Sequence, residues 1–336
     1  MASIILLIRI WIAANLAIVL RTFHRLLLGP SVPSWSWRTE WAVASARAVI
    51  GVASDHQDDP WIRTIGVRFK MPLPLSLRGA VRVSTQLLGR DLADKYERIG
   101  MTKDAATILY FHGGGYVFGN PGTHREHIAR LAARTGATVS APSYRLAPEH
   151  QFPAAVDDAI DAYRALLACC SESSEVIVAG DSAGGGLAVA MVHRARAEGL
   201  PLPAGIMLFS PYVDLDHGGY TIQTNASTDY LPVQELATPN DWYASEKDRR
   251  HPEASPIRAD LTGFPPMLIL VGGSEMLLAD SLRLAENAER DGVLCDLVIE
   301  PDMVHVWPVL VPWEPASKRA LAVCAQWIPK TVNREP

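Results

Sequence analysis

Short apolar runs alternate with longer amphipathic stretches through most of the chain. Between Val156 and Leu167 the apolar residues recur three to four positions apart, which is the spacing of one helix face. Helical patterns also predict helices over 39–52, 278–285 and 315–328. The apolar runs have the length of buried strands; they are Thr107–Phe111, Ala137–Ser140, Val176–Ala179, Ile206–Phe209, Met267–Val271 and Leu297–Ile299. This alternation predicts an α/β fold, with a mostly parallel sheet and helices on both faces.

The first 28 residues do not follow this alternation. MASIILLIRIWIAANLAIVL contains a single charge, Arg9. Its length is close to the ~20 apolar residues that cross a bilayer, but a mid-membrane arginine costs roughly 3 kcal/mol. Three interpretations remain open: a membrane anchor, a secretory signal, and a helix that covers a substrate pocket. We treat 1–28 as a separate segment and expect 29–336 to form the folded domain, membrane-associated if the segment is an anchor and otherwise cytoplasmic.

A second irregular region lies between about 210 and 262. It is rich in Asp, Asn, Thr and Pro, with a weakly helical part around 235–247, and it separates two predicted strands. Insertions at the carboxyl ends of parallel strands commonly build substrate pockets. We therefore expect this region to border a binding site.

Composition excludes some classes of partner. The chain has 336 residues, of which 49% are hydrophobic and 20% charged, and this is enough for a large core. The formal net charge of -5 gives no sign of the basic face that nucleic-acid binding requires. The four cysteines lack metal-ligand spacing. We expect no nucleic-acid partner and no metal or other cofactor, and the oligomeric state stays open.

The pentapeptide GDSAG at 180–184 matches the GxSxG pattern. It follows a predicted strand and opens a predicted helix, which is the setting of a nucleophile elbow. In such a turn the serine hydroxyl projects from the sheet edge, and the glycines leave room for the crowded backbone. We expect Ser182 to be a nucleophile.

A glycine run at 112–116, HGGGY, comes directly after another predicted strand. Acyl transfer needs backbone N–H groups aimed at the developing oxyanion, and glycines let these amides face the site unobstructed. We expect an oxyanion hole formed by Gly113, Gly114 and Ala183. For His112 we expect a structural role in fixing the loop.

The base and the acid should follow the serine in chain order. His305 is the only histidine beyond residue 251, and it lies in a loop after a predicted strand. Two acids, Glu275 and Asp280, follow the strand before it. We favour Glu275 because it lies in the loop, where a buried carboxylate can orient the histidine. Asp280 lies one turn into a helix, where we expect it to face solvent or to cap.

Together these motifs resemble the hormone-sensitive lipase family of α/β-hydrolases. The resemblance rests on HGGGY, YRLAPEHQFPAAVDD, GDSAGGG, SPIRADLTGFPPMLILVGGSEMLLADS and PDMVHVW, in that order over about 100–330. It implies an α/β-hydrolase fold with a Ser182–Glu275–His305 triad and a helical cap from about 29–60 and 210–250. Many members carry Asp-Pro-Leu where this chain has Glu-Met-Leu at 275–277. Relatives similar to arylacetamide deacetylase carry an N-terminal membrane anchor, and PSWSW at 33–37 resembles hydrolases of fungal secondary metabolism.

The expected function is a serine carboxylesterase that acts on short-chain or small-metabolite esters through an acyl-enzyme. Tyr116, Phe118 and Tyr212 are the side chains we expect to line its pocket. An acyltransferase or a lactonase would use the same triad. A non-catalytic receptor on the same fold is the third alternative, and the presence of His305 argues against it because the gibberellin receptors that resemble this family lack that histidine.

Overall fold

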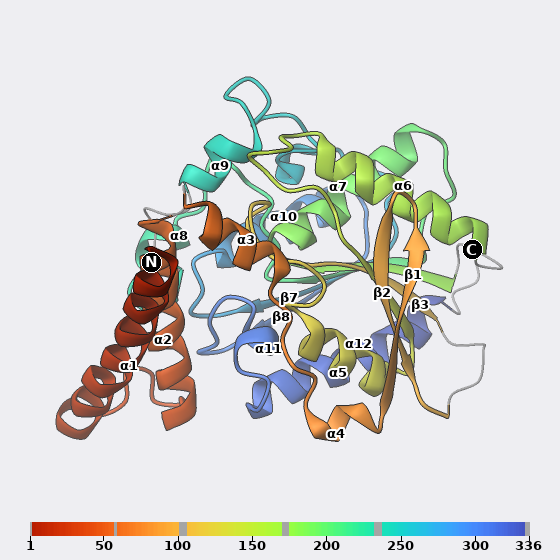
Figure 1. Cartoon of the computed structure of the whole chain (residues 1–336). Coiled ribbons are helices and arrows are strands. Elements are labelled where there is room, and N and C mark those ends of the chain that lie inside the picture. The colour runs from red at the N-terminus through yellow and green to blue at the C-terminus, as the bar shows by residue number, and fades with distance from the viewer. Residues whose placement is uncertain (1, 57–58, 101–105, 170–174, 232–236, 333–336) are drawn as a thin grey trace.

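The computed structural model describes residues 2–56, 59–100, 106–169, 175–231 and 237–332 (Figure 1). Its centre is one eight-stranded sheet with the order β1-β2-β4-β3-β5-β6-β7-β8. The strands are β1 (Val81–Leu88), β2 (Asp91–Arg98), β3 (Thr107–Phe111), β4 (Thr138–Pro142), β5 (Val176–Asp181), β6 (Gly205–Phe209), β7 (Met267–Gly272) and β8 (Cys295–Glu300). The strands from β3 to β8 run parallel, whereas β1 and β2 form an antiparallel edge.

The predicted mostly parallel sheet is confirmed, and all six predicted strands form within a few residues of the expected bounds. The prediction missed the antiparallel pair β1 and β2. Both have mixed burial, because one face packs on the body while the other meets solvent. Partly polar edge strands give a weaker signal than the continuous apolar runs of central strands.

Helices cover both faces of the sheet. One face packs against α6 (Ala154–Cys169), α7 (Ala183–Ala197) and α10 (Leu278–Arg290). The other packs against α5 (Arg125–Thr135), α11 (Trp307–Leu310) and α12 (Pro315–Val332). The periodicity seen in the sequence explains α6, whose residues Val156, Ile160 and Tyr163 are buried. Shorter elements complete the fold: α3 (Pro60–Arg68), α4 (Leu75–Arg78), α8 (Thr221–Thr224), α9 (Ala237–Tyr243) and the 3₁₀ helix η3 (Pro256–Arg258).

The N-terminal residues form two long helices, α1 (Ala2–Leu28) and α2 (Trp37–Ser54). They lie side by side as a hairpin that projects from the body (Figure 1). The guanidinium of Arg25 lies 3.2 Å from the carboxylate of the buried Glu40, which joins the two helices. The indole of Trp41 also donates a hydrogen bond to Thr22 Oγ1, at 3.0 Å.

Much of α1 faces outward. The stretch Ile5–Leu28 is long and apolar enough to cross a membrane, yet only 6% of its most apolar window is buried. Exposed apolar side chains cover its outer surface: Ile5, Leu7, Ile8, Trp11, Ile12, Leu16, Val19, Leu20, Phe23, Leu26, Leu27 and Leu28. A contiguous apolar surface of this kind marks an interaction site on a soluble fold.

Candidate active site

Ser182 lies at the turn between β5 and α7, at the carboxyl edge of the sheet. Its backbone adopts φ 50° and ψ -123°, a conformation that costs on the order of 1–3 kcal/mol for a residue with a side chain. The Ser182 amide donates to the carbonyl of Phe209 at 2.9 Å, which ties the turn to β6. A side chain at Gly184 would collide with the Phe111 carbonyl. The strained turn and its glycine form the geometry that a nucleophile elbow requires.

His305 and Glu275 come together beside this turn. Glu275 follows β7 and His305 follows β8, and both side chains are buried. His305 Nδ1 lies 3.2 Å from Glu275 Oε1. The other carboxylate oxygen, Oε2, accepts hydrogen bonds from the Gly272 amide at 2.7 Å and from Ser210 Oγ at 2.6 Å. These contacts fix the carboxylate so that it orients the imidazole ring.

The electrostatic surroundings favour a protonated His305. Burial lowers the pKa of its imidazole. The hydrogen bond and charge of Glu275, together with the charges of Asp229 and Asp181, raise this pKa by more than burial lowers it. The net result is a pKa above the usual 6.5. An imidazolium formed during catalysis would therefore be stabilised in place.

Asp280, the alternative acid, lies elsewhere. It is buried rather than facing solvent, so that part of the expectation was wrong. One of its oxygens accepts from the amides of Val213 and Asp214, each at 3.2 Å. Burial and the neighbouring Asp214 charge raise its pKa to about 7. Asp280 thus fastens the loop after β6, and the structure brings Glu275 to His305 instead.

The glycine loop differs in one donor from the expected oxyanion hole. The Gly113 amide donates to Asp181 Oδ1 at 3.0 Å, which engages the hydrogen that an oxyanion would need. Gly114 and Gly115 line the cavity beside Ser182. Ala183 is the first residue of α7, where an amide has no partner within the helix. The Gly113 amide is therefore engaged with Asp181, whereas Gly114 and Gly115 border the cavity that Ser182 also lines.

The loop is held from behind by His112. Its Nδ1 donates to the Gly113 carbonyl at 2.8 Å, and its ring stacks on Tyr144 with centroids 4.3 Å apart. Burial and the neighbouring His124 lower the His112 pKa to about 3, so the ring is neutral at physiological pH. This neutral, engaged ring matches the structural role that we expected.

Asp181 organises the same loop from beneath Ser182. It accepts from the Tyr110 hydroxyl at 2.6 Å as well as from Gly113, and its Oδ2 lies 3.1 Å from His124 Nε2. Although burial opposes its charge, the charge and hydrogen bond of His124 and the Tyr110 hydroxyl hold the Asp181 pKa at about 2. Asp181 therefore couples the nucleophile turn to the glycine loop.

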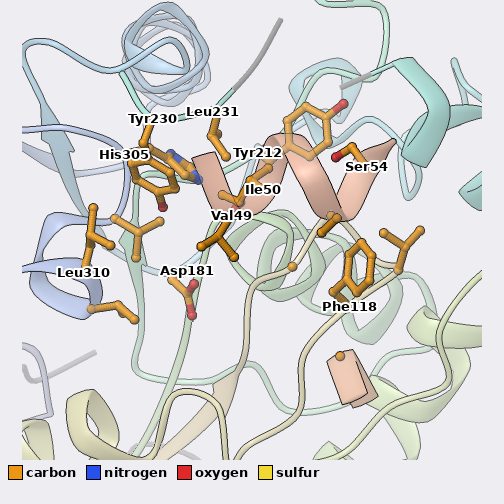
Figure 2. A pocket seen from close by; sticks show the side chains of 18 of the residues that line it. Val49, Ile50, Ser54, Phe118, Asp181, Tyr212, Tyr230, Leu231, His305 and Leu310 are labelled. Atoms are coloured by element: carbon orange, nitrogen blue, oxygen red, sulfur yellow. The ribbon is translucent and has the colours of Figure 1, made fainter. Parts of the chain in front are cut away.

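Ser182 and His305 share a cavity of about 480 Å³. Part of its wall comes from the N-terminal hairpin. Figure 2 shows Val49 and Ile50 of α2 pointing into the cavity, between His305 on one side and Phe118 on the other. The remaining lining is mostly apolar and includes Ile10, Ala53, Ile65, Val117, Leu231, Leu277, Val306, Val309 and Leu310. The site is thus built to receive an apolar group next to the reactive serine.

Two of the three expected pocket residues line this cavity. Phe118 and Tyr212 do so, and the Tyr212 hydroxyl donates to Asn240 Oδ1 at 2.5 Å. Tyr116 does not, because it is buried and stacks on Tyr243 with centroids 3.8 Å apart. The Tyr116 ring packs in the core instead of lining the cavity, so the structure does not place it where we expected it.

One buried acid, Asp229, was not singled out from the sequence. Its Oδ1 accepts from the His305 amide at 3.1 Å, and its Oδ2 accepts from the Met276 amide at 2.8 Å. It lies in a polar segment without a motif, so no sequence signal pointed to it.

Among the described residues, no group of three or more His, Cys, Asp or Glu is placed to hold a metal ion.

Comparison with known proteins assigns this geometry to a family. A model of the α/β hydrolase fold family matches residues 108–309. The chain is 41% identical over 227 residues to an acetyl-hydrolase of Streptomyces hygroscopicus, covering 67% of this chain and 76% of that protein. It is 35% identical over 222 residues to an esterase of Acinetobacter venetianus, covering 66% of this chain and 73% of that protein.

Solved structures give the same result. A crystal structure of an esterase from the bacterial hormone-sensitive lipase family superimposes with a TM-score of 0.78 at 33% identity, covering 89% of this chain and 100% of that chain. A hormone-sensitive lipase from a metagenome library superimposes with a TM-score of 0.73 at 41% identity, covering 78% of this chain and 88% of that chain. Both the fold and the family expected from the sequence are confirmed. The chain belongs to the hormone-sensitive lipase family of α/β-hydrolases and is a serine carboxylic ester hydrolase.

Proposed function

We propose that Ser182, His305 and Glu275 are the catalytic triad of this ester hydrolase. The observation that carries the proposal is the 3.2 Å contact between His305 and Glu275 in a cavity that also contains the strained Ser182. A nucleophile, a base and an orienting acid are the three groups that acyl transfer needs.

The reaction then has two steps. His305 takes the hydroxyl proton of Ser182 as the oxygen bonds to the ester carbonyl carbon, and it returns that proton to the departing alcohol. Water, deprotonated by the same imidazole, attacks the acyl-enzyme and releases the acid and the free serine. Glu275 stabilises the imidazolium in both steps. The amides of Gly114, Gly115 and Ala183 hold the negative oxygen that develops on the carbonyl.

The preferred substrates in this proposal are esters with a short or compact acyl group. The largely apolar cavity of about 480 Å³ fits a small acyl group together with a modest alcohol. Two similar proteins support the choice: one relative is an acetyl-hydrolase, and a solved esterase that superimposes with a TM-score of 0.77 was soaked with p-nitrophenyl butyrate.

Membrane association is the further part of the proposal. The outer surface of α1 is apolar and exposed, whereas its inner surface packs on α2 and supplies Ile10 to the cavity. A spanning α1 would leave Glu40 buried without Arg25 and would open the cavity wall. We therefore place α1 in the plane of the membrane interface, with its apolar side in the lipid.

Replacement of Ser182 by alanine tests the proposed chemistry. We expect Ser182→Ala to lower the turnover of p-nitrophenyl acetate by on the order of 10⁶, because the nucleophile is lost. Circular dichroism and thermal melting should match those of the unmodified protein. A folded variant that keeps near-normal activity would refute the assignment of the nucleophile.

A further inference from the structure

Asp229 joins the two loops that carry the proposed acid and base. Its side chain is fully buried. Oδ1 accepts from the amides of His305 at 3.1 Å and of Tyr230 at 2.8 Å, while Oδ2 accepts from the amide of Met276 at 2.8 Å. Met276 is the residue after Glu275, so one carboxylate holds the backbone of both triad loops at once.

The neighbours of Asp229 grip the acid loop as well. Asn225 Nδ2 donates to the Glu275 carbonyl at 3.0 Å, and Thr228 Oγ1 donates to the Ser274 carbonyl at 2.9 Å. Thr221 Oγ1 donates to the Met276 carbonyl at 2.7 Å. Residues 221–230 therefore hold the backbone of 274–276, the loop that carries Glu275. A shift of 221–230 would move Glu275 with it.

Arg47 connects this segment to the N-terminal hairpin. It lies on α2, and its Nη2 donates to the carbonyls of Ala226 at 3.1 Å and Ser227 at 3.0 Å, and also to the carbonyl of Asp229. Burial lowers the Arg47 pKa, while the charge of Asp229 raises it. The three carbonyls share the two hydrogens of one guanidinium nitrogen, and this contact fixes the backbone that presents Asp229.

We propose that Asp229 is a positioning residue for His305 and Glu275, and that Arg47 holds it in place, so that the N-terminal hairpin sets the alignment of the triad. This inference rests on the proposed triad. The hairpin then has two tasks: α2 closes the substrate cavity through Val49 and Ile50, and it braces the catalytic loops through Arg47.

Asp229 also acts on His305 through its charge. Burial raises the Asp229 pKa to about 6 despite the opposing effect of His305, so the side chain is mostly ionised at neutral pH. Four groups lie around His305. Glu275 Oε1 lies 3.2 Å from its Nδ1, and the Asp229 carboxylate accepts from its backbone amide. The Tyr230 ring lies beside the imidazole, and Asp181 is a more distant charge. Removing the Asp229 charge alone should lower the pKa of the imidazole.

The first test compares Asp229→Ala and Asp229→Asn with the unmodified full chain, using p-nitrophenyl acetate between pH 5 and pH 9. We expect alanine to lower kcat by about 10²-fold with KM changed less than about threefold, the scale of a misplaced catalytic group. Asparagine keeps an acceptor oxygen and should recover part of kcat. It should also move the acidic limb of kcat/KM to lower pH, which a purely structural residue would not do.

Asp280→Asn is the matched control. Asp280 is also buried and accepts hydrogen bonds from two backbone amides, but these amides belong to Val213 and Asp214 and not to the loops of Glu275 and His305. The acidic limb of its kcat/KM profile should lie at the same pH as in the unmodified protein. An Asp229→Asn protein with an unchanged limb and unchanged kcat would overturn the proposal. This comparison holds even if the alanine variant fails to fold.

The second test is a double-mutant cycle between Arg47→Met and Asp229→Asn. If Arg47 acts through Asp229, the losses in kcat are not additive, and the double variant should be no worse than about threefold below the poorer single variant. Arg38→Met is the control from the same helix; Arg38 stacks on Trp313 at 4.5 Å and makes no contact with 221–230 among the described interactions. Additive losses would overturn the role of Arg47.

Labelling by a fluorophosphonate separates this inference from the proposed function. If the unmodified protein is not labelled at Ser182 and does not hydrolyse esters, the proposed triad fails. If it is labelled and active while the Asp229 and Arg47 variants match it in kcat and pH profile, the triad stands and only the positioning role is refuted.

Discussion

The loops that carry the proposed triad and the N-terminal hairpin that covers them are built in different ways. Glu275 and His305 are buried, and hydrogen bonds to Ser210, Gly272 and Asp229 fix their loops. In the hairpin, most of α1 is exposed and apolar. Hydrogen bonds from the hairpin to the body come from α2 and the turn before it, through Trp35, Ser36, Thr39 and Arg47. Polar networks specify one geometry, whereas apolar contacts tolerate many side chains of suitable size.

The difference divides the functions of the molecule. A change in the triad loops should alter the rate of chemistry on every ester. A change in the cavity-facing residues of the hairpin should alter which esters fit, and a change on its outer face should alter where the enzyme resides. Arg47 is the exception in our proposal, because it belongs to the hairpin but acts on the loops.

The largest expected effect is in the triad loops. Glu275→Gln should lower kcat by about 10⁴, the scale found when a triad acid becomes an amide. Asp280→Asn should cost far less, because its contacts are with the amides of Val213 and Asp214. Steady-state kinetics on p-nitrophenyl acetate with both variants decide the point. An Asp280 variant that is the more damaged of the two would reverse the assignment of the acid.

A smaller effect is expected in the cavity wall. Val49→Trp should fill the space opposite the serine and lower kcat/KM for a butyrate ester by about 10-fold relative to an acetate ester, a common scale for pocket discrimination. Val19→Trp is the control, because Val19 is 48% exposed on the outer face of α1. Equal losses on both esters would mean that Val49 does not set acyl length.

The outer face of α1 can be tested without removing the hairpin. Ile12, Leu16 and Phe23 lie on one side of the helix and are 51%, 53% and 59% exposed. Each apolar side chain withdrawn from water contributes up to roughly 1.5–3 kcal/mol, so changing all three to serine should reduce the fraction bound to phospholipid vesicles at least about 10-fold. Hydrolysis of soluble esters should change less than about threefold.

Exposed leucines elsewhere provide the control for this experiment. Leu87 and Leu92, on β1 and β2, are 71% and 61% exposed, and serine at both positions should leave vesicle binding unchanged. Equal binding by the unmodified protein and the α1 variant in flotation assays would contradict placement of this helix at the interface.

The smallest expected effect concerns the pH at which activity falls. His305 must be neutral to accept the serine proton, and its pKa is raised above 6.5. Activity should therefore fall as pH decreases, with the midpoint of the acidic limb above pH 6.5 and a slope of about tenfold per pH unit. A kcat/KM profile that stays flat down to pH 5.5 would contradict this electrostatic environment.

Sequence reasoning was most successful where one local rule determines the structure. A strand followed by GDSAG and a helix can form few geometries. The apolar runs from Thr107–Phe111 to Met267–Val271 form strands that are almost wholly buried, as expected, and only Leu297–Ile299 is a partly exposed edge strand. The choice of Glu275 over Asp280 followed the same logic, and the structure does bring Glu275 to His305.

It was least successful where the outcome depends on a partner far along the chain. The Gly113 amide is engaged because Asp181 lies beneath it, and Tyr116 is buried because Tyr243 stacks on it. Asp229 becomes important only when the loops of Met276 and His305 meet around it. None of these contacts leaves a pattern in the local sequence, since each joins segments tens of residues apart.

The crowded start of α7 limits how this enzyme can diversify. Gly184 and Gly186 press against the carbonyls of Phe111 and Tyr212, so a side chain at either position would strike backbone that cannot yield. In a saturation library these positions should be intolerant, and selection for new substrates would find no variants there. Directed evolution of acyl preference is better aimed at Val49, Ile50 and Phe118, where the cavity wall consists of side chains.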